Sequence, residues 1–173
     1  IEVEEKPTGE ISAGAGIGTE GGTFEFMITE NNWLGKGVQL STNLSVTEQS
    51  LRGGISVANP NYNYTGNLVK ASLESVKTDR STSSGYESTR TGFGLGTEFE
   101  QYEDIFLSPE ISASYEDIRA DTTASSSIKK MDGTFKTFDF MYGITLDKRN
   151  QYFQPTDGYK TDFVQTLPLI QDS

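Results

Sequence analysis

The amino-acid sequence predicts an all-β protein, an antiparallel meander of about nine strands, on three observations. Apolar and polar residues alternate with a period of two along most of the 173 residues, which is the pattern of strands with one apolar face. No apolar run approaches the roughly 18 residues that would cross a bilayer as a helix. We also find no segment with a convincing helical period, so we expect no helix.

The first predicted strand, residues 10–19, shows the alternation most clearly. Apolar side chains occupy its odd positions, and its even positions hold glycine or polar residues. The odd positions are Ile11, Ala13, Ala15 and Ile17. The same pattern predicts eight further strands, over residues 23–29, 38–46, 51–57, 69–74, 92–99, 107–116, 138–146 and, more weakly, 159–167.

Alternation alone also fits a soluble β-sandwich or a lipocalin-like barrel. Strand length and charge favour a membrane barrel instead. Several segments run ten or more residues, the length that a tilted strand needs to cross a bilayer. Charged residues also lie well inside the strands, as expected where the polar face lines a water-filled barrel. They are Glu25, Lys70, Glu74, Glu110 and Asp139.

The connections support the same prediction. In a meander, alternate connections lie at the same end of the sheet. One end then receives the polar segments 79–85 and 121–134, and the other receives most of the aromatic connection residues, which are Trp33, Tyr62, Tyr64, Tyr102, Phe106, Tyr152 and Phe153. An aromatic belt at one boundary is typical of a membrane interface. Because single-chain bacterial barrels generally have an even number of strands, we expect this chain to be an internal fragment whose barrel is incomplete.

Composition argues against several function classes. The net charge of −11 argues against a nucleic-acid partner, whose phosphates require a basic surface. The absence of cysteine and histidine removes thiol chemistry, the commonest general base and the commonest metal ligand. The glycine-rich segments 14–18 and 92–96 lack the spacing and the lysine of a nucleotide loop. We predict instead that their glycines lie on the polar face of the sheet, where they make room for other groups or let the strand bend. We therefore predict no enzyme, no cofactor and no metal site.

Two segments depart from the alternation. Residues 32–37, Asn-Trp-Leu-Gly-Lys-Gly, form a predicted tight turn after the second strand. Residues 147–158 form a longer predicted turn after the eighth strand, in which Pro155 and Gly158 interrupt the chain and Asp147 and Arg149 can pair across the base. Taken alone, both segments are predicted to be turns at a membrane surface.

These segments carry a resemblance to the BamA family, which inserts proteins into the bacterial outer membrane. Residues 3–9 resemble that family's exit from its last periplasmic POTRA domain into the barrel. Two turns then resemble family turns in the same order, with Ala58-Asn59-Pro60 as a weaker third match. The first turn contains Trp33, Leu34 and Gly35, and the second contains Asp147, Arg149, Phe153, Pro155, Thr156 and Gly158. The resemblance covers essentially the whole chain.

The resemblance implies two regions. Residues 1–8 would be the end of the last POTRA domain with its linker, and residues 9–173 the N-terminal half of a transmembrane barrel in the outer membrane of a Gram-negative bacterium. The first strand would then be the lateral-gate edge on which substrate barrels fold. Its substrate-binding residues would be Gly9, Ile11, Ser12, Ala13, Gly14, Ala15, Gly16, Ile17 and Gly18. Partners would be unfolded outer-membrane proteins, periplasmic accessory lipoproteins and the lipid bilayer.

Physical chemistry makes such an edge plausible without the resemblance. An edge strand offers unpaired N–H and C=O groups that can pair with many different sequences. Four glycines among residues 9–18 leave the register of this strand weakly specified. Three alternatives remain open at this stage: a related translocation or secretion barrel, a passive pore, and a soluble ligand-binding barrel.

Overall fold

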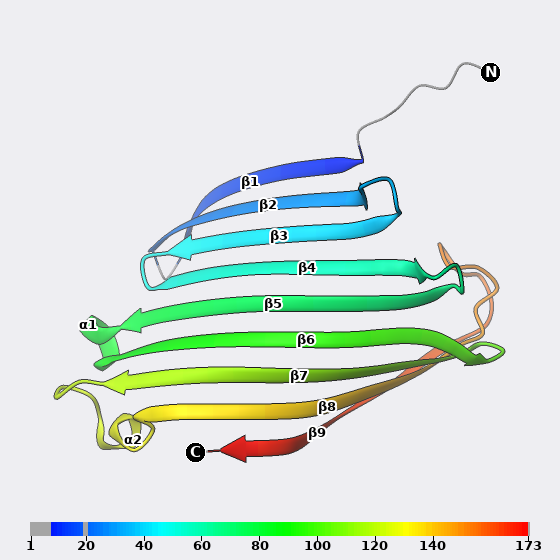
Figure 1. The fold of residues 1–173 in the computed structure, drawn as a ribbon. Coiled ribbons are helices and arrows are strands. Elements are labelled where there is room, and N and C mark those ends of the chain that lie inside the picture. Colours follow the sequence, from blue (N-terminus) through cyan, green and yellow to red (C-terminus); the bar gives the residue numbers. More distant parts are fainter. Residues whose placement is uncertain (1–7, 19–20, 173) are drawn as a thin grey trace.

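The computed structural model describes residues 8–18 and 21–172 as one nine-stranded antiparallel sheet in the order β1 to β9 (Figure 1). The predicted meander is confirmed, because each strand pairs with its neighbours in the sequence. The strands are β1 Gly9–Gly18, β2 Gly21–Trp33, β3 Val38–Thr47, β4 Ser50–Tyr62, β5 Asn67–Arg80, β6 Tyr86–Tyr102, β7 Ile105–Ala120, β8 Gly133–Asp147 and β9 Lys160–Asp172. The expectations for residues 1–7, 19, 20 and 173 lie outside the described residues.

The connections alternate between two ends of the sheet (Figure 1). We call the end with the β2–β3, β4–β5, β6–β7 and β8–β9 connections the turn end. The opposite end, which we call the loop end, carries two short helices, α1 Ser81–Ser84 and α2 Ser126–Lys129. The expectation of no helix was therefore wrong. Each helix is a single turn of four residues, which is too short to produce a helical period in the sequence.

Four residues of the expected aromatic belt lie in strands and not in connections. Trp33, Tyr62 and Tyr102 are the last residues of β2, β4 and β6, and Phe106 lies near the start of β7. Phe106 was expected in the connection between the sixth and seventh strands, but β7 already begins at Ile105. The connection is shortened to two residues by Asp104, whose φ of 66° allows a tight turn. By alternation Phe106 lies on the same face as Ser108 and Glu110, which is the polar face of the sheet.

The register separates an apolar face from a polar face. One row across seven strands is apolar throughout, and it comprises Leu40, Val57, Ala71, Leu95, Ile111, Phe140 and Leu167. One residue along each strand, on the other face, lies a row of small and polar residues that we call the serine row. Its members are Ser41, Ser56, Ser72, Gly94, Ser112 and Asp139. In these two rows, the predicted alternation therefore separates an apolar face from a polar face across the sheet.

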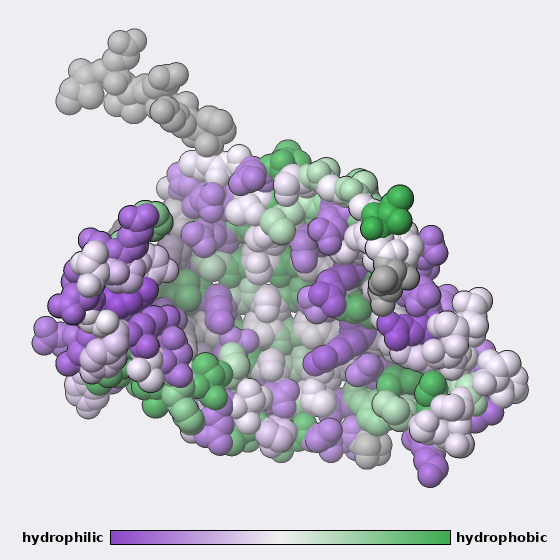
Figure 2. Space-filling model, turned by 180° about the vertical axis from the view of Figure 1, so that it is seen from behind, coloured by the Kyte–Doolittle hydropathy of each residue, from purple (hydrophilic) through white to green (hydrophobic). Residues whose placement is uncertain are grey.

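The sheet is a single curved layer, and no second layer of the described residues covers either face. Among the described residues only Ile118 and Ala124 are buried hydrophobic side chains. The polar face is concave, and Figure 2 shows it hollowed, with hydrophilic side chains around and within the hollow. A soluble sandwich would bury its apolar face against a second sheet. This arrangement, with large hydrophobic side chains exposed on the convex face, is the one expected of a barrel wall in lipid.

Two connections at the turn end share one geometry. In the β2–β3 connection, Gly37 N donates to Asn32 Oδ1 at 2.6 Å, and Leu34 has a φ of 57°. In the β4–β5 connection, Gly66 N donates to Asn61 Oδ1 at 2.8 Å. In each, an asparagine closes the turn by accepting from a glycine five residues later. The predicted tight turn at residues 32–37 is confirmed.

Two connections at the loop end, β5–β6 and β7–β8, pack against each other. Asp121 N donates to Gly85 O at 2.8 Å, and a Cβ on Gly85 would lie 2.6 Å from Ala124 N. Gly85 also has a φ of 73°, so both its backbone conformation and its close neighbours require glycine. The expected polar loop end is therefore an ordered junction between the β5–β6 and β7–β8 connections.

No helix in the described part of the chain is long and apolar enough to cross a membrane.

Candidate functional site

The first candidate site is the edge formed by β1. Within the described sheet, β1 pairs with β2 alone, over ten opposed residues from Gly9↔Glu30 to Gly18↔Gly21. Every residue of β1 is exposed. A Cβ placed on Gly14, Gly16 or Gly18 would meet nothing within 4 Å. All the predicted substrate-binding residues of this strand therefore lie together on an accessible edge.

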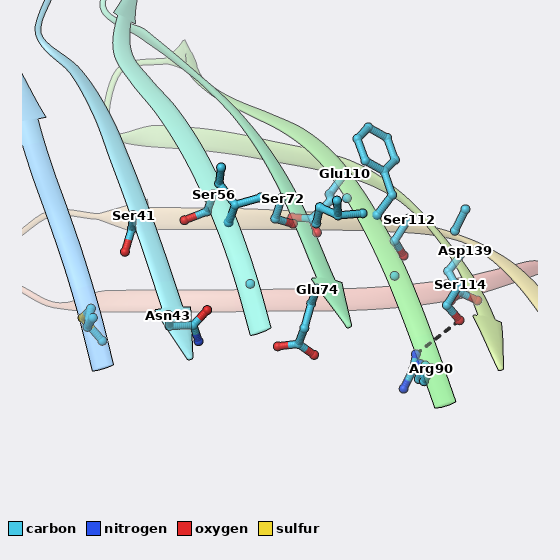
Figure 3. A pocket seen from close by; sticks show the side chains of 18 residues that line it. Ser41, Asn43, Ser56, Ser72, Glu74, Arg90, Glu110, Ser112, Ser114 and Asp139 are labelled. Carbon is cyan, nitrogen blue, oxygen red and sulfur yellow. Dashed lines mark hydrogen bonds between the residues drawn. The ribbon is translucent and has the colours of Figure 1, made fainter. Parts of the chain in front are cut away.

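The second candidate is the hollow on the concave face, which has a volume of about 450 Å³. Its wall is built from the serine row and from charged side chains on the neighbouring rows (Figure 3). Arg90 Nη2 donates to Ser114 Oγ at 3.4 Å, and Ser114 Oγ lies 2.6 Å from Thr137 Oγ1. The side chains labelled in Figure 3 are polar or charged, as the wall of an aqueous barrel interior requires.

An ion pair crosses the concave face above β6. Lys70 Nζ on β5 and Glu110 Oε2 on β7 are 2.6 Å apart, although β6 lies between their strands. A Cβ on Gly96 would lie 2.8 Å from Lys70 Cε and 3.2 Å from Glu110 Oε2. Gly96 therefore provides the space in which the two side chains meet. This agrees with the prediction that glycines of residues 92–96 make room on the polar face. A Cβ on Gly14, Gly16 or Gly18 would meet nothing within 4 Å, so the described residues show no such role for the glycines of residues 14–18.

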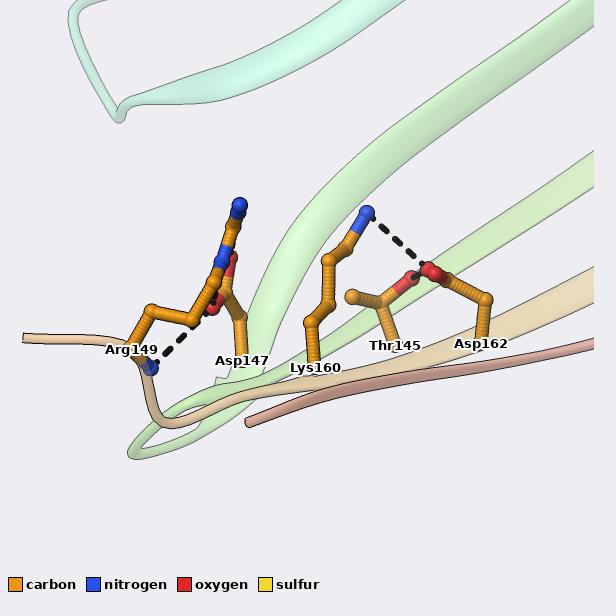
Figure 4. A network of polar contacts seen from close by, with 5 residues as sticks. All are labelled: Thr145, Asp147, Arg149, Lys160 and Asp162. Atoms are coloured by element: carbon orange, nitrogen blue, oxygen red, sulfur yellow. Dashed lines mark hydrogen bonds and ion pairs between the residues drawn. The ribbon is translucent and has the colours of Figure 1, made fainter. Parts of the chain in front are cut away.

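The third candidate is the β8–β9 connection with its strand ends (Figure 4). Arg149 binds the carboxylate of Asp147 through two bonds, Nε to Oδ1 at 2.8 Å and Nη2 to Oδ2 at 2.6 Å. The predicted pairing across the base of the turn is confirmed. This bidentate contact with Asp147 also raises the pKa of Arg149 above its ordinary value.

A second pair lies beside the first on the same side of the ribbon (Figure 4). Lys160 Nζ is 3.1 Å from Asp162 Oδ1, and Thr145 Oγ1 donates to the same oxygen at 2.7 Å. The charges of the two pairs balance within the network. Its geometry therefore suits a clamp that holds the turn against β8 and β9, and it leaves no unpaired charge for a substrate.

The remainder of this turn is fastened by its own hydrogen bonds. Asn150 Oδ1 accepts from Thr156 N at 3.2 Å and from Asp157 N at 3.3 Å. A Cβ on Gly158 would lie only 2.0 Å from Lys148 O, and its φ is 90°. These contacts explain why the motif needs glycine at 158. The side chain of Phe153, which belongs to the same motif as Gly158, is 78% exposed.

The predicted residues fall into separate groups. The β1 edge lies at one margin of the sheet, and the β8–β9 turn connects the two strands at the opposite margin. The turn containing Trp33, Leu34 and Gly35 lies at the turn end, and the first two of these side chains are exposed. The structure therefore brings the β1 residues together with one another, and it does not unite them with either turn motif in one site.

Two features were missed in the sequence. The first is the Asn61–Gly66 turn, for which the spacing Asn-x₄-Gly, already present at Asn32–Gly37, was a visible signal. The second is a set of contacts between Thr8, before β1, and Glu30 and Asn31 on β2. That set has no sequence signal because the register of β1 against β2 creates it.

The described residues contain no group of three or more His, Cys, Asp or Glu side chains placed to hold a metal ion. The acidic side chains that do have close partners are engaged with hydroxyls, backbone N–H groups or basic side chains. The arrangement therefore offers surfaces for binding, namely a strand edge and a polar concave wall.

The chain is similar in fold to a solved structure and in sequence to a protein family. It resembles the solved structure of BamA from Haemophilus ducreyi lacking POTRA domains 1–3, with a TM-score of 0.70 and 21% sequence identity. The match covers 96% of this chain and 35% of that one, so this chain spans about a third of that structure. A protein-family model described as the Omp85 superfamily domain matches residues 32–171. The chain therefore belongs to the Omp85 superfamily, whose members are outer-membrane insertases and translocases.

Proposed function

We propose that this chain is the N-terminal part of the barrel of a non-enzymatic outer-membrane insertase. In this proposal β1 is the lateral-seam edge on which substrate β-barrel proteins fold and insert. The observation that carries the proposal is the accessible edge of β1, which has one partner strand in the described sheet and mostly small side chains.

Backbone pairing allows this edge to bind strands of many different sequences. N–H and C=O groups are the same in every sequence, so a strand can add to β1 whatever its side chains are. Bulky side chains on β1 would restrict the incoming strand, but Ser12, Ala13 and Gly14 offer little obstruction. The proposed partners are unfolded outer-membrane proteins, periplasmic accessory lipoproteins and the surrounding bilayer. No cofactor is required.

The concave wall fits the same proposal. A polar, hydrated interior lets the wall of the barrel face water while its convex face contacts lipid. A passive pore would need the same wall, however, so the wall alone does not distinguish the two functions. The distinguishing feature is whether β1 takes part in substrate binding.

Disulfide crosslinking in the full-length protein tests the proposal, and none of the 173 residues of this chain is a cysteine that could interfere. Single cysteines would be placed at each position from Ser12 to Gly18 and paired with cysteines in the last strand of a stalled substrate. We expect a ladder of crosslinks in one register. Crosslinks to no position of β1, in a protein that still resides in the membrane, would contradict the insertase proposal and favour a pore. A ladder formed with a transported passenger instead of a barrel substrate would identify a translocase of the same superfamily.

A further inference from the structure

The turn end of β1 is held by side chains of β2. Glu30 lies opposite Gly9, and its Oε1 accepts hydrogen bonds from the Thr8 hydroxyl and from Asn32 N, the latter at 2.8 Å. The backbone oxygen of Thr8 accepts two more, from Asn31 N at 3.2 Å and Asn31 Nδ2 at 3.1 Å. Three hydrogen bonds thus join Thr8 to Glu30 and Asn31.

Gly9 is part of the same arrangement. A Cβ on Gly9 would lie 2.9 Å from Glu30 Oε2. The Glu30 carboxylate therefore occupies the space beside the first residue of β1, and a side chain there would push it away from Thr8. We call Thr8, Gly9, Glu30 and Asn31 the β1 clamp.

Among the residues that the structure describes, the loop end of β1 has no equivalent. Gly16, Ile17 and Gly18 oppose Thr23, Gly22 and Gly21, so four of the six residues lack a side chain. A Cβ on Gly16, Gly18 or Gly22 would meet nothing within 4 Å. Beyond the backbone ladder, the described contacts that hold β1 to β2 are therefore concentrated at the turn end.

This asymmetry matters because β1 has a weakly specified register. Small side chains and glycines give little preference for one pairing over another. A slip by one residue would turn Ile11 and Ala13 from the convex face to the concave face, and a slip by two would shift every pairing while keeping the faces. A fixed contact at one end prevents both slips and leaves the other end free to move.

We propose that Glu30 and Asn31 are positioning residues, which clamp the start of β1 and set its register on β2 for the incoming substrate strand. The inference rests on the proposed function for its purpose, because the register of β1 fixes the register of any strand that adds to it. The clamp itself is a property of β1 and β2, and it can be measured without a substrate.

The first test measures the β1–β2 register in the full-length protein. Two cysteine pairs are compared: Ala13→Cys with Phe26→Cys, which are directly opposed, and Ala13→Cys with Phe24→Cys, which requires a slip by two residues. In the double variant Glu30→Ala/Asn31→Ala, we expect the ratio of slipped to in-register disulfide to rise about tenfold, because two side-chain hydrogen bonds to Thr8 are lost. An unchanged ratio would overturn the clamp.

Controls separate the clamp from general damage. Glu25→Ala removes a carboxylate from the same strand without touching Thr8, and it should leave the ratio unchanged. Glu30→Gln keeps an oxygen acceptor for Thr8 and Asn32 and should restore most of the native register. If the double variant does not fold, Thr8→Val removes a single donor, and hydrogen exchange then reports the clamp. Exchange should accelerate at Glu10 and stay unchanged at Gly16, because the N–H groups of both residues point towards β2 in the ladder that begins with Asn31 N and Thr8 O. Equal acceleration at both positions would overturn the proposal.

The second test uses the substrate crosslinks along Ser12 to Gly18. A positioning role predicts that Glu30→Ala shifts the crosslink ladder by two residues or spreads it over several registers. A purely structural role would weaken all crosslinks by the same factor, and that result would overturn the proposal. If the native protein gives the crosslink ladder and the variants leave the β1–β2 register unchanged, only the clamp is refuted. If the variants change the β1–β2 register but the native protein gives no crosslink ladder with substrate, only the proposed function is refuted.

Discussion

Lys70 and Glu110 form an ion pair across an intervening strand, with 2.6 Å between Nζ and Oε2. The pair ties β5 to β7 above Gly96 of β6. Three neighbouring strands are therefore linked on the concave face by side chains as well as by the backbone ladder. The absence of a side chain at residue 96 is the condition for this link.

Gly96→Val should break that link. A branched side chain at 96 would occupy the space in which Lys70 Cε and the Glu110 carboxylate lie. We expect a loss of about 1 kcal/mol in the free energy of unfolding, because a partly exposed ion pair contributes no more than that. The measurement is urea unfolding of the full-length protein in detergent micelles. Gly92→Val is the matched control on the same strand, since a Cβ on Gly92 would meet Ser114 Cβ at an ordinary 3.8 Å. Equal losses in both variants would contradict the explanation.

Arg149→Lys should loosen the β8–β9 turn although the charge is kept. Lysine cannot form the two parallel bonds that Arg149 makes with Asp147. We expect faster tryptic cleavage within residues 148–160, measured by limited proteolysis of the full-length protein. Arg119→Lys is the control, because Arg119 pairs with Asp117 at a highly exposed position and should behave as the native protein does. A turn that resists trypsin equally in both variants would show that the bidentate geometry is dispensable.

The two asparagine turns should respond alike to substitution. Asn32→Ala and Asn61→Ala each remove the acceptor for a glycine N–H five residues later. Each should lower the free energy of unfolding by about 1 kcal/mol, as measured by urea unfolding in micelles. Asn67→Ala removes an asparagine whose side chain makes no hydrogen bond to another described residue, and it should have little effect. A large effect at only one of the two turns would mean that their shared geometry does not determine stability.

The loop-end junction should weaken in acid. Hydrogen bonds from the side chain and backbone of Thr123 hold the pKa of Asp121 below its ordinary value of 3.8. A group with a lowered pKa stabilises the folded state above its ordinary pKa and loses that contribution as pH falls below it. We therefore expect hydrogen exchange at Thr123 and Ala124 to accelerate below about pH 4, relative to Asp121→Asn at each pH. Identical pH profiles in the two proteins would remove Asp121 from this role.

Much of the fold could be predicted because the alternation is set by the environment of each face. Lipid on the convex face and water on the concave face require apolar and polar residues at successive positions, and the strands from 107 and 138 show this clearly. The outer parts of the longer strands could not be predicted in the same way. Beyond Leu73 and before Phe93, both faces of β5 and β6 carry polar residues such as Ser75 and Thr91, which are bonded to each other, so the period disappears while the backbone ladder continues.

The candidate site was predicted less completely than the fold. The Asp147–Arg149 pair was predictable because both partners lie two residues apart in the sequence. The β1 clamp was not, because Thr8 and Glu30 are 22 residues apart and meet only when the register of β1 is fixed. The contact between Lys70 and Glu110 was not predictable either, because the two residues lie on β5 and β7, which are separated by β6.

The most direct measurement of the central claim is the binding of backbone-blocked peptides to the full-length protein. Two peptides would copy the last strand of a substrate, each N-methylated at alternate residues so that only one of its edges can donate hydrogen bonds. If β1 takes strands by backbone pairing, the peptide blocked on the edge that faces β1 should lose binding, and the peptide blocked on the opposite edge should bind as the unmodified strand does. Equal binding of both peptides would show that recognition does not depend on backbone pairing at β1 and would contradict the account.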